Sequence, residues 1–191
     1  VGREVVRQLC VRGGKPIAHV RPDSPKLATW RATFGELGAA VDASPWSATA
    51  LATPLRELRI RELYILIGTT RSKAKTDRVS GDIYQQIDRG LTEIAVDAAK
   101  QVGGIRLIYL SSVGADARAS SAYLKARGQA EEAVRGSGLP WVIARPSFIV
   151  GERDESRVGE SIGAGIGDGV LAVAGLFGGK KLRAKYRSTS A

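Results

Sequence analysis

An unbroken apolar run at residues 63–67, Leu-Tyr-Ile-Leu-Ile, most narrows the folds that this chain can adopt. A run of this kind that ends at a glycine is typical of a strand buried on both faces of a parallel sheet. Similar short segments recur along the chain, and segments with apolar residues at helical spacing separate them. The expected strands are 16–20, 39–41, 63–67, 105–110 and 141–144, and the expected helices are 2–9, 27–34, one within 47–61, 82–101 and 121–135. This alternation predicts an α/β domain with a doubly wound parallel sheet.

The composition is that of one globular domain over residues 1–191, with 43% apolar and 25% charged residues. The single Cys10 excludes a disulfide within the chain and favours a reducing, cytoplasmic setting. With one cysteine and one histidine, His19, we expect no Cys/His metal site. The apolar stretch 162–177 is shorter than a membrane span and is interrupted by Asp168, so we expect no membrane segment.

The net charge of +10 has two interpretations. One is binding to a polyanion such as nucleic acid. The other is a domain that binds a phosphorylated cofactor and has an arginine-rich, solvated surface. The basic residues are scattered along the chain, and neither a helix-turn-helix nor an aromatic-rich RNA-binding pattern is visible. The sequence therefore favours the second interpretation over nucleic acid.

The first residues look like the end of a phosphate-binding turn. In doubly wound dinucleotide-binding folds, the first helix follows a strand and a glycine-rich turn that holds the pyrophosphate. This chain opens on Val1-Gly2-Arg3, so Gly2 is expected to be the last glycine of that turn. We therefore expect a partial domain, truncated at both ends, without its first strand and without a further helix after Ala191.

Several residues at expected strand ends are suited to a nucleotide. Arg21 follows the strand at 16–20, where an arginine accommodates the 2′-phosphate of NADP and an acid binds the ribose of NAD. Arg21 therefore favours NADP(H), with NAD(H) as the alternative, although a solvated arginine would look the same. Asp42 could bond the adenine, and Gly68 with Thr69 could lie along the cofactor, although ordinary turns also explain the aspartate and the glycine.

Hydroxyls, a phenol and a cation follow the expected strand at 105–110. Tyr123 and Arg127 are four residues apart and so share one face of the next helix. A nearby cation stabilises the phenolate, which suits a tyrosine that exchanges a proton with a carbonyl oxygen. Ser112 would orient that oxygen, whereas Lys125 faces another side of the helix. A core tyrosine and a surface arginine are the alternative interpretation.

Several sequence blocks of the chain resemble those of a known family. The blocks that carry the resemblance are Leu66-Ile-Gly-Thr-Thr-Arg-Ser-Lys-Ala, Leu110-Ser-Ser-Val-Gly-Ala-Asp, Tyr123-Leu-Lys-Ala-Arg-Gly-Gln-Ala-Glu and Arg145-Pro-Ser. They are similar to the atypical short-chain dehydrogenase/reductases, and within these to the NmrA-like and Tat-interacting-protein-like NAD(P)H-binding oxidoreductases. The resemblance implies a Rossmann-like fold that binds NADP(H) or NAD(H). The family includes both reductases and cofactor-sensing regulators.

The resemblance also implies roles for individual residues. Tyr123 would be the proton donor, with Ser112 and Arg127 as its catalytic partners, and Arg127 stands where the family usually has lysine. The expected cofactor contacts are Gly2, Arg21, Asp42, Gly68, Thr69, Ser111, Tyr123, Arg127, Pro146, Ser147 and Phe148. The expected activity is hydride transfer to or from a carbonyl or alcohol of an unknown small molecule. The alternative is a non-catalytic NADP(H)-sensing regulator that acts on a protein partner.

Overall fold

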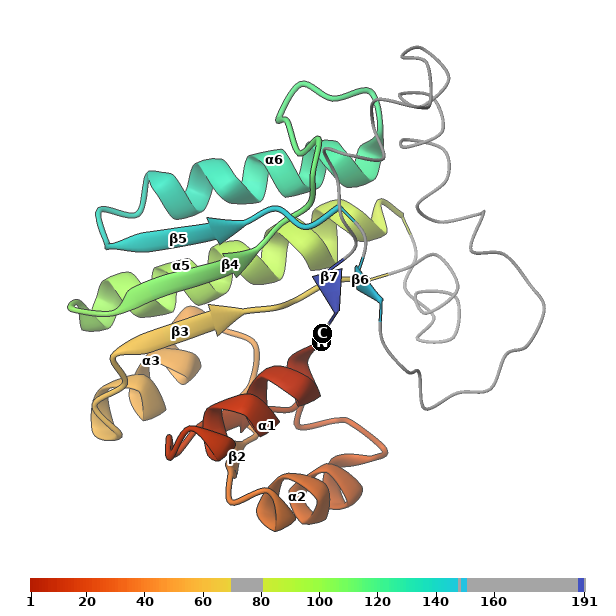
Figure 1. Ribbon diagram of the computed structural model, residues 1–191. Coiled ribbons are helices and arrows are strands. Elements are labelled where there is room, and N and C mark those ends of the chain that lie inside the picture. Colours follow the sequence, from red (N-terminus) through yellow and green to blue (C-terminus); the bar gives the residue numbers. More distant parts are fainter. Residues whose placement is uncertain (70–80, 148, 151–188, 191) are drawn as a thin grey trace.

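In the computed structural model, residues 1–69, 81–147, 149–150 and 189–190 are described (Figure 1). The helices are α1 (Gly2–Val11), α2 (Leu27–Glu36), α3 (Ala48–Glu57), the π-helix η1 (Tyr84–Gly90), α5 (Leu91–Val102) and α6 (Ala122–Arg135). The strands are β1 (Ile17–His19), β2 (Ala40–Asp42), β3 (Glu62–Ile65), β4 (Arg106–Leu110), β5 (Trp141–Ala144), β6 (Ile149–Val150) and β7 (Thr189–Ser190). The predicted alternation of strands and helices is confirmed.

Every strand pair in the described residues is parallel. β1 pairs with β2, β4 lies between β3 and β5, and β6 pairs with β7. The α/β class and the parallel pairing that the sequence predicts are therefore confirmed. Within the described ranges, β1 is not hydrogen-bonded to β3, so the two larger groups of strands form separate ladders.

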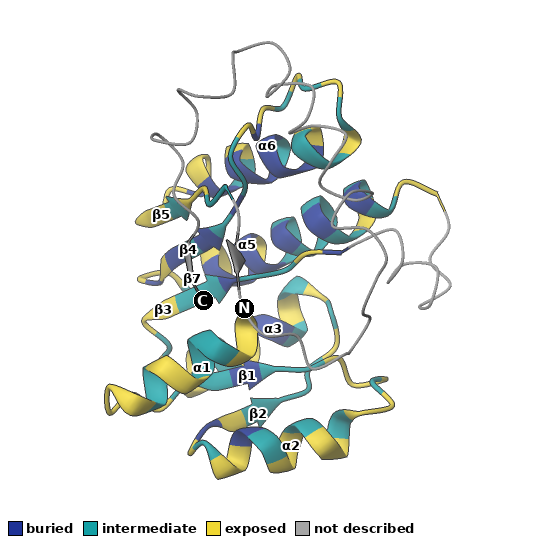
Figure 2. Ribbon diagram, turned by 45° about the vertical axis from the view of Figure 1, so that its right-hand side comes forward, coloured by how far each residue is buried: buried dark blue, intermediate teal, exposed yellow. Residues whose placement is uncertain are grey.

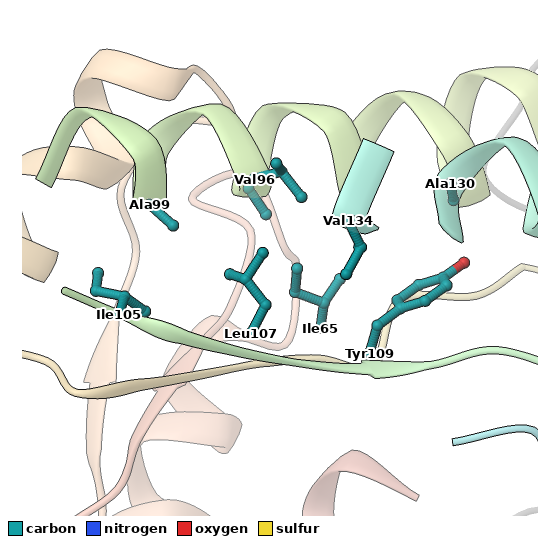
Figure 3. Packing of buried hydrophobic residues seen from close by; sticks show 9 residues of the cluster. Ile65, Val96, Ala99, Ile105, Leu107, Tyr109, Ala130 and Val134 are labelled. Atoms are coloured by element: carbon teal, nitrogen blue, oxygen red, sulfur yellow. The ribbon is translucent and has the colours of Figure 1, made fainter. Parts of the chain in front are cut away.

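Each of these two ladders has its own apolar core. Helices α1 and α2 pack on β1 and β2 around Ala18, Phe34 and Ala39. Helices α5 and α6 pack on the second ladder, where the fully buried Leu107 and Tyr109 of β4 alternate with Ile108 (Figure 3). Figure 2 shows the buried sides of α5 and α6 turned toward the strands. The period of two in β4 is that of a strand with only one fully covered face.

The prediction that 63–67 is a strand buried on both faces is wrong. The strand ends at Ile65, and only Ile65 is fully buried. The side chain of Tyr64 points to the opposite face, where a cavity of about 340 Å³ separates it from α1. Among the described residues, no helix packs tightly on that face of β3. Tyr64 is half-buried there, and its hydroxyl donates to Glu62 (3.0 Å).

The single α-helix predicted at 82–101 is a π-helix followed by an α-helix. A π-helix closes its hydrogen bonds over five residues instead of four, so its turn is wider. An α-helix over 82–101 would align Ile83, Ile87 and Leu91 on one apolar stripe facing the core, but all three are only half-buried. The buried residues are instead Tyr84, Asp88 and Thr92, and the Thr92 hydroxyl donates to the Asp88 carbonyl (2.7 Å).

Helix α6 holds the loop that joins it to β4. The loop lies so close to Gly128 that a Cβ there would be 2.2 Å from the Ala117 nitrogen and 2.2 Å from the Asp116 carbonyl carbon. The Asp116 amide also donates to the Leu124 carbonyl (3.3 Å). The absence of a side chain at Gly128 therefore allows the loop that contains Ser112 to pack against α6.

Among the described residues, no helix is long and apolar enough to cross a membrane.

Gly128→Ala should lower the free energy of unfolding by about 2 kcal/mol or more, because the added methyl collides with backbone atoms that cannot turn aside. Gly35→Ala is the control, since that helical glycine has no atom within 4 Å of the Cβ position. It should be neutral or stabilising by up to about 1 kcal/mol. Urea unfolding of both variants measures the difference, and equal stability of the two would contradict the close packing of the loop.

Candidate functional site

The predicted site residues gather at one edge of the strands. Parallel strands end on the same side, and in Figure 1 β3, β4 and β5 point to the side on which α1 begins. The described residues at or just beyond strand ends are Arg21, Asp42, Gly68, Thr69, Ser111, Ser112, Pro146 and Ser147, and Gly2 opens α1. Phe148 lies outside the described residues.

The ends of β1 and β2 present an exposed cation beside an ordered acidic turn. The Arg21 side chain is 45% exposed, and its Nε lies 3.9 Å from Asp23. Asp42 accepts hydrogen bonds from the hydroxyl (2.7 Å) and the amide (3.3 Å) of Ser44. The His19 ring contacts the Ser44 carbonyl oxygen (2.9 Å). Asp42 thus shapes its own turn, which agrees with the ordinary-turn alternative and leaves an adenine contact as a prediction.

Arg127 is buried at the ends of β3 and β4. Its guanidinium donates to the Tyr109 hydroxyl (3.2 Å) and to the Leu110 carbonyl (3.0 Å). Its Nη2 forms an ion pair with Asp88 Oδ1 (2.9 Å), and only 6% of the Arg127 side chain is exposed. The surface arginine of the alternative interpretation is therefore excluded. A contact with a cofactor ribose stays a prediction.

The Arg127 guanidinium lies directly beside Gly68. A Cβ on Gly68 would lie 2.6 Å from Arg127 Nη2, so a side chain at this position would require the guanidinium to move. The other side of Gly68 is exposed, so the approach of a ligand to its backbone remains open. The sequence predicted a cofactor contact or an ordinary turn at Gly68. The structure shows in addition that Gly68 lies beside a buried guanidinium.

Asp88 is a buried acid at the candidate site that the sequence did not predict. It is fully buried in η1, and its Oδ2 accepts the backbone N–H of Thr69 (3.2 Å). Burial raises the pKa of Asp88 from 3.8 to about 6, although Arg127 and the Thr69 amide act in the opposite direction. Asp88 lies one position away from the expected apolar stripe, so only the four-residue spacing from Tyr84, the same as from Tyr123 to Arg127, could have drawn attention to it.

Tyr123 lies in the first turn of α6 and contacts one aromatic and one cationic side chain. Its ring meets the Tyr84 ring edge-on, with centroids 5.5 Å apart. The Arg127 Cζ lies 5.4 Å from the centre of the Tyr123 ring. The predicted approach of Tyr123 and Arg127 is confirmed, and Lys125 is exposed as expected. Ser112, at the end of β4, donates its hydroxyl to the Val113 carbonyl (3.3 Å).

A buried carboxylate ties the segment after β5 to α6. Glu131 is fully buried and receives Arg145 Nε (2.7 Å), Arg145 Nη2 and Arg135 Nη2 (2.8 Å). Burial alone would raise the pKa of Glu131, but the hydrogen bonds from Arg145 hold it below its ordinary value. The Val113 amide donates to the Pro146 carbonyl (3.0 Å). These contacts place Pro146 and Ser147 beside the loop that contains Ser112.

The profile of the NAD(P)H-binding family matches residues 1–165. The chain belongs to that family. Within it, the chain is of the atypical short-chain dehydrogenase/reductase type that the sequence blocks suggested. Binding of a nicotinamide cofactor is therefore part of its family character, whereas the preferred cofactor is a separate question.

Solved structures support the same fold. The chain resembles a protein described as an NAD-dependent epimerase/dehydratase from Bacillus halodurans, with a TM-score of 0.61, 22% identity, and coverage of 79% of this chain and 67% of that one. It also resembles the triphenylmethane reductase of a Citrobacter species, solved with NADP(H), with a TM-score of 0.54, 14% identity, and coverage of 77% and 46%. At these identities the likeness concerns the fold.

The names of curated relatives contradict the expected cytoplasmic location. "Protein FMP52-1, mitochondrial" of Scheffersomyces stipitis is 37% identical over 47% of this chain and 38% of its own length. "Protein fmp52, mitochondrial" of Emericella nidulans is 34% identical over 63% of this chain and 49% of its own length. The chain thus spans half or less of these relatives. Their names make the cytoplasmic expectation wrong, because a single reduced cysteine suits any reducing compartment.

The described residues fit a nicotinamide dinucleotide. Arg21 offers an exposed guanidinium for a phosphate, and the Gly68 backbone is exposed at the end of β3. Gly2 stands at the amino end of α1, and the backbone N–H groups of a helix amino end are suited to an anionic group. Within the described ranges, no group of three or more His, Cys, Asp or Glu residues could hold a metal ion.

Asp88→Asn should change how the free energy of unfolding depends on pH. The raised pKa of Asp88, about 6 against 3.8, means that folding takes up a proton between these values. The resulting stabilisation is fully present below the unfolded pKa and is lost as the pH rises through the folded pKa. Relative to the variant, wild type should lose about 3 kcal/mol between about pH 3 and pH 7. Urea unfolding at both pH values checks this, and a constant difference would contradict it.

Proposed function

We propose that this chain is the cofactor-binding part of an NADP(H)-dependent oxidoreductase acting on a carbonyl or alcohol of a small molecule. The family supports the nicotinamide cofactor. The observation that carries the catalytic part is the placement of Tyr123 beside the Arg127 guanidinium at the cofactor edge of the strands. The mitochondrial names of the curated relatives support the same compartment for this protein.

NADP(H) is the proposed cofactor because a cation follows β1. Arg21 would bind the 2′-phosphate with its forked N–H groups. The Gly2 end of α1 would receive the pyrophosphate. Gly68 and Thr69 would lie along the cofactor, with Asp42 near the adenine and Ser111, Pro146 and Ser147 near the nicotinamide. These contacts rest on the positions of the residues at one edge of the strands.

The bound cofactor supplies or accepts the hydride at the substrate carbon. In the direction of reduction, Tyr123 would donate its phenolic proton to the carbonyl oxygen, so that hydride and proton together yield the alcohol. In oxidation the same phenol would take the proton back. Ser112 would orient the oxygen by a hydrogen bond. The Arg127 guanidinium, whose Cζ lies 5.4 Å from the centre of the Tyr123 ring, would place a positive charge beside the reacting phenol.

A cofactor sensor without catalysis is the second candidate. The engagement of Arg127 favours it, because the guanidinium is held by Asp88, Tyr109 and Leu110 and so differs from a lysine that reaches a ribose. In that case the protein would bind NADP(H) and report it to a protein partner. The two candidates share the cofactor and differ in whether Tyr123 matters for turnover.

Titration of the full-length protein with NADPH and NADH should show tighter binding of NADPH. Arg21→Ala should reduce NADPH affinity about tenfold and leave NADH affinity unchanged, because only NADPH carries the 2′-phosphate. Fluorescence of the reduced nicotinamide measures both. Failure to bind either cofactor would sink the proposed function, and preference for NADH would remove the role of Arg21.

Tyr123→Phe should lower kcat for a carbonyl probe such as an o-quinone by about 10²-fold or more, since it removes the proton donor. NADPH affinity should change little. Tyr64→Phe is the control, because Tyr64 bonds Glu62 on a face of β3 that looks toward α1. Unchanged turnover in Tyr123→Phe would favour the sensor.

A further inference from the structure

Two pairs of side chains join η1 to α6. On η1, Tyr84 and Asp88 are four residues apart, and on α6, Tyr123 and Arg127 have the same spacing. Tyr84 meets the Tyr123 ring at 5.5 Å between centroids, and Asp88 meets Arg127 at 2.9 Å. The π-helix thus contacts both side chains to which the proposed function assigns proton exchange and charge.

Asp88 also reaches the segment expected along the cofactor. One carboxylate oxygen receives the Thr69 backbone N–H (3.2 Å), and the other faces Arg127 Nη2 (2.9 Å). Arg127 in turn occupies the space where a Gly68 side chain would project. One buried carboxylate therefore connects the end of β3 to the helix that bears Tyr123.

We propose that Asp88 is a positioning residue of the site, which holds Arg127 beside Tyr123 and fixes the Gly68–Thr69 segment against it. This inference rests on the proposed function. Asp88 and Arg127 are both buried, so solvent screens their interaction little. Its carboxylate acts through Arg127 and Thr69 rather than on a substrate.

Loss of the carboxylate should have two separable effects. A buried guanidinium without its partner destabilises the fold, which is a structural effect. Release of Arg127 and of the Thr69 amide should also loosen the cofactor segment, which is the effect that the inference concerns. A variant in which both charges are removed separates the two, because no buried charge is then left unpaired.

The test compares Asp88→Asn, Arg127→Gln and the double variant in the full-length protein, with NADPH as the probe. Dissociation constants come from nicotinamide fluorescence at a temperature at which each variant is folded, and stability comes from thermal unfolding. Asp97→Asn is the matched control, because Asp97 is exposed on α5 and pairs only with Lys100 (3.5 Å) among the contacts described. It should change neither quantity.

Asp88→Asn should weaken NADPH binding about tenfold. The double variant should regain stability relative to Asp88→Asn while its NADPH affinity stays low. Recovery of affinity together with stability would overturn the inference, since Asp88 would then serve only the fold. Wild-type affinity in Asp88→Asn would also overturn it. If wild type binds neither NADPH nor NADH, the proposed function itself fails. If Asp88→Asn does not fold, the double variant is compared with Arg127→Gln, which keeps the bond from the Thr69 amide to Asp88: weaker NADPH binding by the double variant supports the inference, and equal binding overturns it.

Discussion

The buried ion pair between Asp88 and Arg127 is the interaction on which the site depends. A guanidinium removed from water is stabilised by partners for its charge and for its N–H groups. Asp88 on η1 pairs with the charge, and the Tyr109 hydroxyl and the Leu110 carbonyl of β4 accept hydrogen bonds from Nη1, whereas Nε has no hydrogen-bond partner among the described residues. Beyond the end of β3, the guanidinium occupies the space into which a side chain at Gly68 would project. Three segments far apart in the sequence therefore meet at one cation.

The positions of most elements follow from local pattern. Apolar runs and glycine stops located the strands, and the four-residue spacing of Tyr123 and Arg127 predicted that they share a face of α6, as they do. These features are encoded within a few neighbouring residues. Asp88 was not predicted, because its burial depends on the π-turn and on a partner 39 residues away in the sequence. The partial cover of β3 likewise depends on how α1 packs, which no local pattern encodes.

A second buried acid has a complementary role. Glu131 binds Arg145 and Arg135 and so attaches the end of β5 to α6, while Asp88 attaches the end of β3 to the same helix through Arg127. Helix α6 is thus connected by charged contacts to the segments on either side of β4. Tyr123 lies at the start of this helix, so its position is determined by both neighbouring strand ends.

The π-helix makes the length of its segment as important as its composition. An α-helix advances about 100° per residue, so the loss of one residue from η1 would turn everything before it relative to α5. Tyr84 and Asp88 would then leave the face that meets α6, even though every contacting residue was still present. Relatives of this protein that retain the same pairing should therefore vary in side chains within this segment far more readily than in its number of residues.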